Sequence, residues 1–175
     1  MLKIISIAVV LLVGGILLFA AARPDFFRVE RSAVIKAPPG KIFAQINDLK
    51  AWGAWSPYEK KDPAMKRTIG AVTAGKGAVY EWHGDKNVGK GRMEITDAAA
   101  PSKIVIKLDF LEPFEAHNTA EFTMEGKGEA TTVTWAMHGP VNFVSKLMGA
   151  FFDMDKMIGT DFAAGLANLK SIAEK

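Results

Sequence analysis

An uncharged apolar run near the N-terminus constrains this chain more than any other feature. The run IISIAVVLLVGGILLFAAA extends from Ile4 to Ala22 and lies between Lys3 and Arg23. As a helix it would be roughly 28 Å long at ~1.5 Å per residue, close to the ~30 Å hydrocarbon thickness of a bilayer. We therefore predict a transmembrane anchor over residues 1–23.

Two other interpretations of this run stay open. Ala20, Ala21 and Ala22 have the small side chains of a signal-peptide cleavage site, although the run is longer than the ~7–15 apolar residues of a typical signal core. A buried core helix would also be apolar on every side.

Two features of the sequence predict opposite orientations for the anchor. Basic residues follow the run at Arg23, Arg28, Arg31 and Lys36, and strict counting then places the domain on the cytoplasmic side. A free tail of three residues usually stays on the side of synthesis, which places the domain on the other side. We predict a single-pass membrane protein, of the inner membrane if bacterial, and favour a periplasmic domain while leaving its side open.

The rest of the chain has the composition of one globular domain. Its 175 residues fit the ~100–200 residues of a single domain. The absence of cysteine excludes disulfides, thiolate nucleophiles and cysteine-ligated metal centres. A formal net charge of +3 gives no electrostatic footprint for nucleic acid. We expect one domain over residues 26–175, joined to the anchor by a short Arg-Pro-Asp segment.

Hydrophobic periodicity predicts a strand, two short helices, six strands and a long helix. Residues 27–35 alternate as a strand does, and residues 39–49 carry apolar side chains at helical spacing. The segment Ser56-Pro57-Tyr58-Glu59 fits a capping box at the start of a second short helix. Strands separated by turn residues are predicted over 65–72, 78–84, 89–97, 103–111, 115–125 and 130–138.

The last third of the chain changes to a helical period. Apolar residues from Met154 to Ile172 fall on one face and predict a long helix that Asp153 or Asp155 would cap. The apolar stretch over residues 143–152 would form a separate short helix. Short connections between the strands imply antiparallel hairpins.

Four segments of this pattern resemble a known superfamily. They are FRVERSAVIKAPP from Phe27, the tryptophans and Ser-Pro pair of residues 52–57, YEWHG with GKGRMEI in residues 80–95, and DKMIG through GLANLK in residues 155–170. Together they resemble the START-like (Bet v 1-like, SRPBCC) superfamily, in its bacterial polyketide cyclase/dehydrase-type branch, over residues 26–173.

The resemblance implies both a fold and a kind of function. The fold is α+β, a helix-grip fold in which a seven-stranded curved antiparallel sheet wraps around the long C-terminal helix, with two short helices after the first strand. Here the transmembrane helix would precede it. Members are mostly carriers or sensors of apolar small molecules and lipids, and some catalyse aromatic cyclisation. No catalytic residue of a characterised cyclase matches a position in this sequence, so none is carried over.

Aromatic and methionine side chains are the candidate ligand-binding residues. Large rings bury area at low entropic cost and methionine adapts its shape, so both suit a pocket for an apolar ligand. An ordinary filled core would use the same residues, and both interpretations stand. The inferred fold would bring the following around one space: Trp52, Trp55, Trp82, Phe110, Phe114, Trp135, Met137, Met148, Phe151 and Phe152.

Candidates for catalysis are few. Glu81 and His83 are two apart on one predicted strand and would share a face, where they could transfer protons inside a cavity. If the strand has the opposite phase, Tyr80 and Trp82 face inward and the side chains of Glu81 and His83 are exposed to solvent. Tyr80 is the third catalytic candidate. The sequence has no G-x-S-x-G or S-x-x-K motif, and its histidines lack metal-ligand spacing. We expect no metal and no cofactor.

These observations predict a membrane-anchored START-like domain with a cavity between the sheet and the C-terminal helix. The cavity would bind an apolar or amphipathic small molecule, either a lipid or a polyketide-like compound. The partners would be that ligand and the membrane, and not nucleic acid. Two alternatives stay open: a cyclase or dehydratase that uses the same pocket, and a protein-interaction domain at the membrane.

Overall fold

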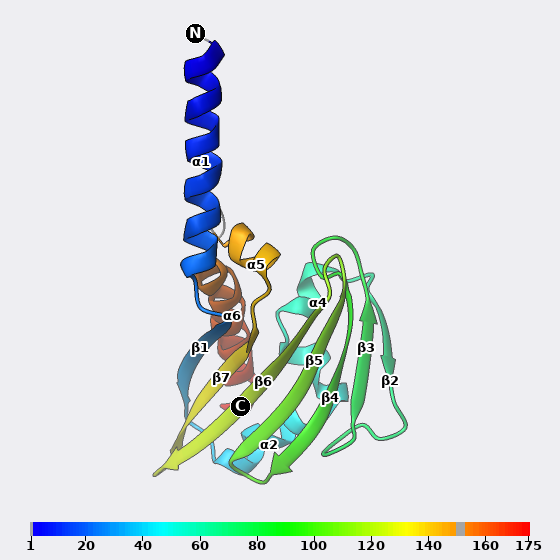
Figure 1. Ribbon diagram of the computed structural model, residues 1–175. Helices are drawn as coiled ribbons and strands as arrows, with labels where there is room; N and C mark the ends of the chain where they lie inside the picture. Colours follow the sequence, from blue (N-terminus) through cyan, green and yellow to red (C-terminus); the bar gives the residue numbers. More distant parts are fainter. Residues whose placement is uncertain (1, 150–152) are drawn as a thin grey trace.

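Seven antiparallel strands form one curved sheet that wraps around a long helix (Figure 1). The computed structural model describes residues 2–149 and 153–175. The strands lie in the order β1-β7-β6-β5-β4-β3-β2, so every neighbouring pair except β1 and β7 is consecutive in the chain. In chain order the elements are α1 (Leu2–Ala22), β1 (Phe26–Ile35), α2 (Pro39–Asn47), the 3-10 helix η1 (Leu49–Ala51), α3 (Trp52–Trp55), α4 (Tyr58–Lys61), β2 (Lys66–Ile69), β3 (Val79–His83), β4 (Lys90–Ala99), β5 (Lys103–Glu112), β6 (Ala116–Lys127), β7 (Ala130–Pro140), α5 (Phe143–Met148) and α6 (Met154–Ala173).

This architecture confirms the predicted helix-grip fold class, with two local differences. The structure adds η1 and α3 between the two expected short helices. The predicted strand over residues 65–72 is shorter than expected, because β2 ends at Ile69. The chain after β2 folds back over the end of α2, where the Leu49 backbone N–H donates to the carbonyl of Thr73 at 2.9 Å.

The long helix α6 lies across the concave face of the sheet (Figure 1). Asp153, one of the two caps predicted from the sequence, accepts a hydrogen bond from the Lys156 backbone N–H in the first turn at 3.0 Å. Phe162, Leu166 and Leu169 are its large buried side chains, and they recur at helical spacing toward the sheet.

Two contacts fix the ends of α6, one an ion pair with β1 and the other a hydrogen bond with the residue that follows β1. At the start of the helix, Arg31 on β1 pairs with Asp155, with Nη2 and Oδ2 2.8 Å apart. At the other end, the Glu174 carboxylate accepts the Lys36 backbone N–H at 2.7 Å. The helix therefore runs alongside β1, with its N-terminus at the end of the sheet where β1 begins.

The helices that follow β1 close the far end of the interior. Trp55 is fully buried and meets Phe122 edge-on, with ring centroids 6.0 Å apart. The indole N–H of Trp52 donates to the carbonyl of Ile46 at 2.8 Å, and that of Trp55 to the carbonyl of Gln45 at 3.1 Å. Both tryptophans thus place their rings in the core while their polar atoms are satisfied by α2.

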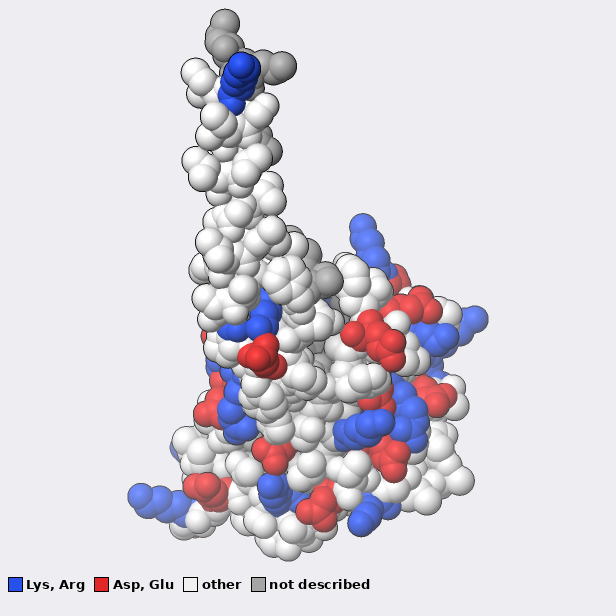
Figure 2. All heavy atoms as spheres, in the orientation of Figure 1, with Lys and Arg blue, Asp and Glu red and all other residues white. Residues whose placement is uncertain are grey.

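Helix α1 stands away from the domain (Figure 1) and is uncharged along most of its length (Figure 2). Most of its described large side chains are exposed, including Leu11 at 70% and Leu18 at 74%. These exposures exclude the core-helix interpretation. The helix is long and apolar enough to cross a membrane, and a signal sequence would meet the same criteria.

A glycine lets α6 approach the sheet closely. A Cβ on Gly165 would lie 2.7 Å from Cζ3 of Trp135 and 3.0 Å from Cδ of Pro57. The close approach of helix and sheet therefore accounts for Gly165, which adds no open space beside the helix.

We predict that Gly165→Ala destabilises the protein by about 1–3 kcal/mol, because the added methyl overpacks the contact with Trp135. Alanine in a helix is otherwise favoured over glycine by about 1 kcal/mol, so the sign of the change is diagnostic. Gly53→Ala is the matched control, since a Cβ there meets nothing within 4 Å. Guanidinium unfolding of the full chain in detergent, followed by tryptophan fluorescence, measures both. Equal stability of the two variants would contradict the prediction.

Candidate functional site

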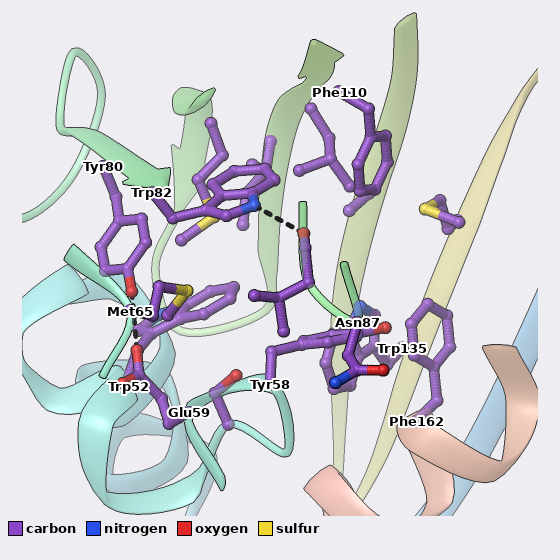
Figure 3. Close-up of a pocket in the computed structure, with 17 residues that line it drawn as sticks. Trp52, Tyr58, Glu59, Met65, Tyr80, Trp82, Asn87, Phe110, Trp135 and Phe162 are labelled. Carbon is purple, nitrogen blue, oxygen red and sulfur yellow. Dashed lines mark hydrogen bonds between the residues drawn. The ribbon is translucent and has the colours of Figure 1, made fainter. Parts of the chain in front are cut away.

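A pocket of about 160 Å³ lies between the concave face of the sheet, α6 and the segment from α3 to α4 (Figure 3). Its walls are mainly aromatic, aliphatic and methionine side chains, with few polar groups. The lining residues are Trp52, Ser56, Tyr58, Glu59, Met65, Tyr80, Trp82, Asn87, Val88, Met93, Ile106, Leu108, Phe110, Ala120, Trp135, Met137 and Phe162.

Stacked rings form the wall beside α6. Phe162 on α6 lies parallel to Trp135 on β7, with ring centroids 4.1 Å apart and an angle of 11° between the planes. On its other side Trp135 stacks on Phe122 at 4.9 Å. Stacked rings this deep in the interior hold one another in fixed orientations, so this wall is rigid.

A second aromatic wall lies on β3 and β5. Trp82 meets Phe110 edge-on at 5.8 Å, and its indole N–H donates to the carbonyl of Val88 at 3.0 Å. The ring covers Gly91 on β4, where a Cβ would lie 2.3 Å from Cζ2 of the indole. The hydrogen bond ties the β3–β4 turn to the pocket wall.

One polar cluster enters this apolar pocket, from α4 and the β2 edge. The Tyr80 hydroxyl donates to Oε1 of Glu59 at 2.7 Å, and Nη2 of Arg67 lies 2.5 Å from Oε2 of Glu59. The Glu59 side chain is only 9% exposed. Both carboxylate oxygens therefore have partners, as a nearly buried charge requires.

The tyrosines at the pocket hold their protons strongly. Burial, and then the hydrogen bond to Glu59, raise the pKa of Tyr80. Burial, and then the charge of Asp161, raise the pKa of Tyr58. Both hydroxyls are therefore neutral hydrogen-bonding groups throughout the physiological range.

The structure places the ten sequence-predicted ligand residues in three groups. Five line the pocket: Trp52, Trp82, Phe110, Trp135 and Met137. Two others lie elsewhere, because Trp55 packs behind Trp52, with ring centroids 4.7 Å apart, and Phe114 is 69% exposed on the β5–β6 turn. Phe151, Phe152 and the side chain of Met148 lie outside the described part of the chain, so those predictions stay predictions.

The predicted catalytic pair Glu81 and His83 is on the wrong face for proton transfer in the pocket. Tyr80 and Trp82 point inward, so strand alternation turns Glu81 and His83 to solvent. The Glu81 carboxylate instead lies 3.8 Å from Arg92 on the outer face. Tyr80 is the one of the three candidates that lines the pocket.

The carboxylate of the site and several residues of its apolar walls were not predicted from the sequence. Met93, Ile106, Leu108 and Ala120 alternate on predicted strands, so the register of the sheet would have revealed them. Glu59 carried a misleading signal, because the predicted capping box does not form. Helix α4 has no side-chain cap, and the carboxylate turns to Tyr80 and Arg67.

The described residues offer no cluster of three His, Asp or Glu side chains that could hold a metal ion. The polar side chains that line the pocket are Ser56, Tyr58, Glu59, Tyr80 and Asn87.

We predict that the two tyrosines, the only ones in the chain, do not ionise in the folded protein near pH 10. The pKa values of both phenols are raised in the folded protein. The neutral phenols therefore stabilise the folded state below the unfolded pKa of about 10, and this stabilisation is lost as the pH rises through the folded pKa values. Tyrosinate absorbance during a pH titration measures this, with the denatured chain as control and Tyr58→Phe to assign the signals. A native titration that overlays the denatured one would contradict it.

Solved structures share this fold at low sequence identity. Protein CV1439 from Chromobacterium violaceum aligns over 87% of this chain and 99% of its own, with a TM-score of 0.61 and 14% identity. The Aha1 dimer from Colwellia psychrerythraea aligns over 85% of this chain and 96% of its own, with a TM-score of 0.61 and 16% identity. The di-domain ARO/CYC BexL from the BE-7585A biosynthetic pathway aligns over 90% of this chain and 53% of its own, with a TM-score of 0.63 and 13% identity. These likenesses show the fold alone.

The family is shown by the sequence of the domain. No curated protein matches the chain. The family model described as "Polyketide cyclase / dehydrase and lipid transport" matches residues 27–174, which is nearly everything after α1. The match agrees with the helix-grip fold and with the segments that resembled the SRPBCC superfamily. This chain therefore belongs to the polyketide cyclase/dehydrase and lipid transport family.

Proposed function

We propose that this protein is a membrane-anchored binding protein whose pocket takes the apolar part of a small amphipathic molecule. The observation that carries the proposal is the pocket itself, with stacked aromatic walls and one buried, fully paired carboxylate. Apolar walls with a few placed polar groups are the usual composition of small-molecule sites.

The volume of the pocket limits what it can enclose. About 160 Å³ compares with the ~150 Å³ apolar cavity that holds benzene, and it is below the ~300–1,000 Å³ of pockets that enclose a whole drug-sized ligand. We infer that one ring or the end of a chain enters, while the rest of the ligand stays at the mouth. The pocket also exceeds the ~30 Å³ share of one water, which favours a ligand over the protein-interaction alternative.

The polar cluster would orient the ligand. The Tyr80 hydroxyl donates its proton to Glu59, and its oxygen also interacts with the Arg67 side chain. A remaining lone pair of that oxygen could accept a hydrogen bond from a ligand hydroxyl or amine. We infer that the ligand carries such a donor next to its apolar part.

Anchoring by α1 is the second half of the proposal. The helix spans Leu2–Ala22, about 31 Å at ~1.5 Å per residue, which suffices to cross the hydrocarbon core. Its exposed apolar side chains have no partner surface on the described domain except near its last turn, where Ala20 is fully buried. A bilayer would cover them.

We predict that Ala120→Leu fills the pocket and weakens binding of a ring-sized probe about tenfold or more, because its methyls occupy the probe's volume. Bromobenzene is the probe, since its heavy atom quenches the indoles that line the pocket. Fluorescence quenching of the full chain in a non-aromatic detergent gives the half-saturation concentration.

Thr119→Leu is the matched control, because it adds bulk to the opposite face of the same strand. Unchanged affinity in Ala120→Leu, or equal loss in both variants, would count against the pocket as the binding site.

An enzyme of the cyclase or dehydratase kind is the second candidate, favoured by the carboxylate of Glu59 inside the pocket. Its two oxygens already contact Tyr80 and Arg67, so a substrate would have to compete with these partners for the carboxylate. Because of this competition, we rank catalysis below binding as the function of the pocket.

Mass spectrometry of the small molecule that co-purifies with the full chain separates these two functions. We expect wild type and Glu59→Gln to carry a molecule of the same mass, because a carrier does not change its ligand. A ligand heavier by one water in Glu59→Gln would show a dehydratase whose substrate accumulates, and would overturn the carrier assignment.

A further inference from the structure

Several elements meet at the end of the sheet where α1 joins the domain (Figure 1). Strand β1 begins there, and Phe26 pairs with Pro140, the last residue of β7. Asp109 near the end of β5 pairs with His117 near the start of β6, and Thr119 on β6 pairs with His138 on β7, so the β5–β6 turn lies at this end too. Helix α6 also starts here. We call this the anchor end of the domain.

Exposed apolar side chains gather at the anchor end. In the described part of the chain outside α1, eight large apolar side chains are exposed, and six of them lie here. The other two, Val34 and Val72, lie toward the opposite end. We call the six the apolar rim: Phe26, Leu111, Phe114, Phe143, Met154 and Met157. Figure 2 shows an uncharged area beside the base of α1, with charged side chains at the base itself and around the rest of the domain.

The length of the joint places the rim next to a membrane. Only residues 23–25 separate α1 from β1, so Ala22 and Phe26 are at most roughly 14 Å apart at ~3.6 Å per residue. The headgroup region on each side of a bilayer is about 5–8 Å thick. If α1 spans the membrane, the start of β1 cannot be far beyond the headgroups.

Contacts around the joint hold the anchor end in this position. Lys146 on α5 forms an ion pair with Asp25 in the joint, and its own side chain is only 9% exposed. Ala20 in the last turn of α1 is fully buried where α1 meets α5. Helix α5, which carries Phe143 of the rim, is therefore fastened to the base of the anchor.

The pocket becomes more exposed toward this same end. The lining residues Val88 and Phe110 are half-buried and Asn87 is exposed, whereas Ile106 and Trp135, further along their strands, are buried. Lys90 pairs with Glu112, so the β3–β4 turn lies beside the β5–β6 turn at the anchor end. The mouth of the pocket therefore lies among the elements that carry the rim.

We propose that the apolar rim inserts into the interface of the bilayer that holds α1, so that the pocket opens onto the membrane and takes its ligand from the lipid phase. The ligand is then a membrane-soluble amphiphile. This inference rests on the proposed anchoring and pocket, and it adds the surface that docks and the route of entry.

Spin labels on the full chain test the docking without any ligand. The chain has no cysteine, so Phe114→Cys and Met157→Cys give single labelling sites on the rim. Val72→Cys is the control, being 50% exposed at the opposite end. The labelled chain is reconstituted into phosphatidylcholine–phosphatidylglycerol vesicles after its intact mass shows that residues 1–23 are retained.

We expect both rim labels to collide with oxygen, relative to a water-soluble nickel complex, at a ratio at least about fivefold above that of the Val72 label. Equal ratios at all three sites would overturn the proposal. Rim labels that are already shielded in detergent, in a dimer, would also overturn it, because a second copy would then cover the rim. A chain recovered without residues 1–23 would overturn it too.

A second variant tests the entry route. Phe114→Asp with Met157→Asp should slow uptake of a fluorescent single-chain amphiphile from vesicles about tenfold, because two apolar insertions are lost. Quenching by bromobenzene in detergent should be unchanged. If wild type does not bind bromobenzene, the proposed pocket is wrong, and the spin-label result still tests the docking of the rim separately. Unchanged uptake by the double variant would defeat the entry route alone.

Discussion

The stack of Phe162 on Trp135 is the contact on which the rest of the structure depends. It sets the distance between α6 and the sheet, at 4.1 Å between ring centroids, and Gly165 one turn later permits that distance by having no side chain. On one side of the stack Trp55 and Phe122 are fully buried. On the other side the sheet curves away from the helix and the pocket remains. The same contact therefore closes one half of the interior and bounds the open half.

The Glu59 cluster is not explained by stability alone. An apolar side chain at this position would avoid the cost of removing a carboxylate from water, and buried ion pairs often stabilise a fold less than a hydrophobic replacement would. The cluster joins α4 to strands β2 and β3 across the pocket wall, but α4 could be held there by apolar contacts. A paired carboxylate and a neutral phenol at the edge of an apolar pocket are instead the kind of groups that select a ligand by its polar end.

Periodicity predicted the fold well because most of the strands are buried mainly on one face. Ile104 and Ile106 on β5, for example, are buried while Lys107 is exposed, so alternation in the sequence carries the register directly. The site was harder, because a pocket wall and a filled core use the same residues. Trp52 and Trp55 lie one helical turn apart, yet only Trp52 reaches the pocket. Glu59 was missed for a related reason: its role depends on where β2 and β3 lie, which no local pattern around α4 contains.

The small size of the pocket is related to the proposed position of the domain beside a membrane. Burying a Phe-sized group contributes only about 1.5–3 kcal/mol, and a ligand held by one ring or chain end therefore binds weakly from dilute solution. An apolar molecule is concentrated in a bilayer, and under the proposed anchoring a domain tethered through the three residues after α1 would meet it at that raised concentration. A shallow, ring-sized pocket is thus adequate at a membrane surface, where it would be a poor carrier in water. Under the proposed anchoring, α1 contributes to ligand binding as well as to localisation.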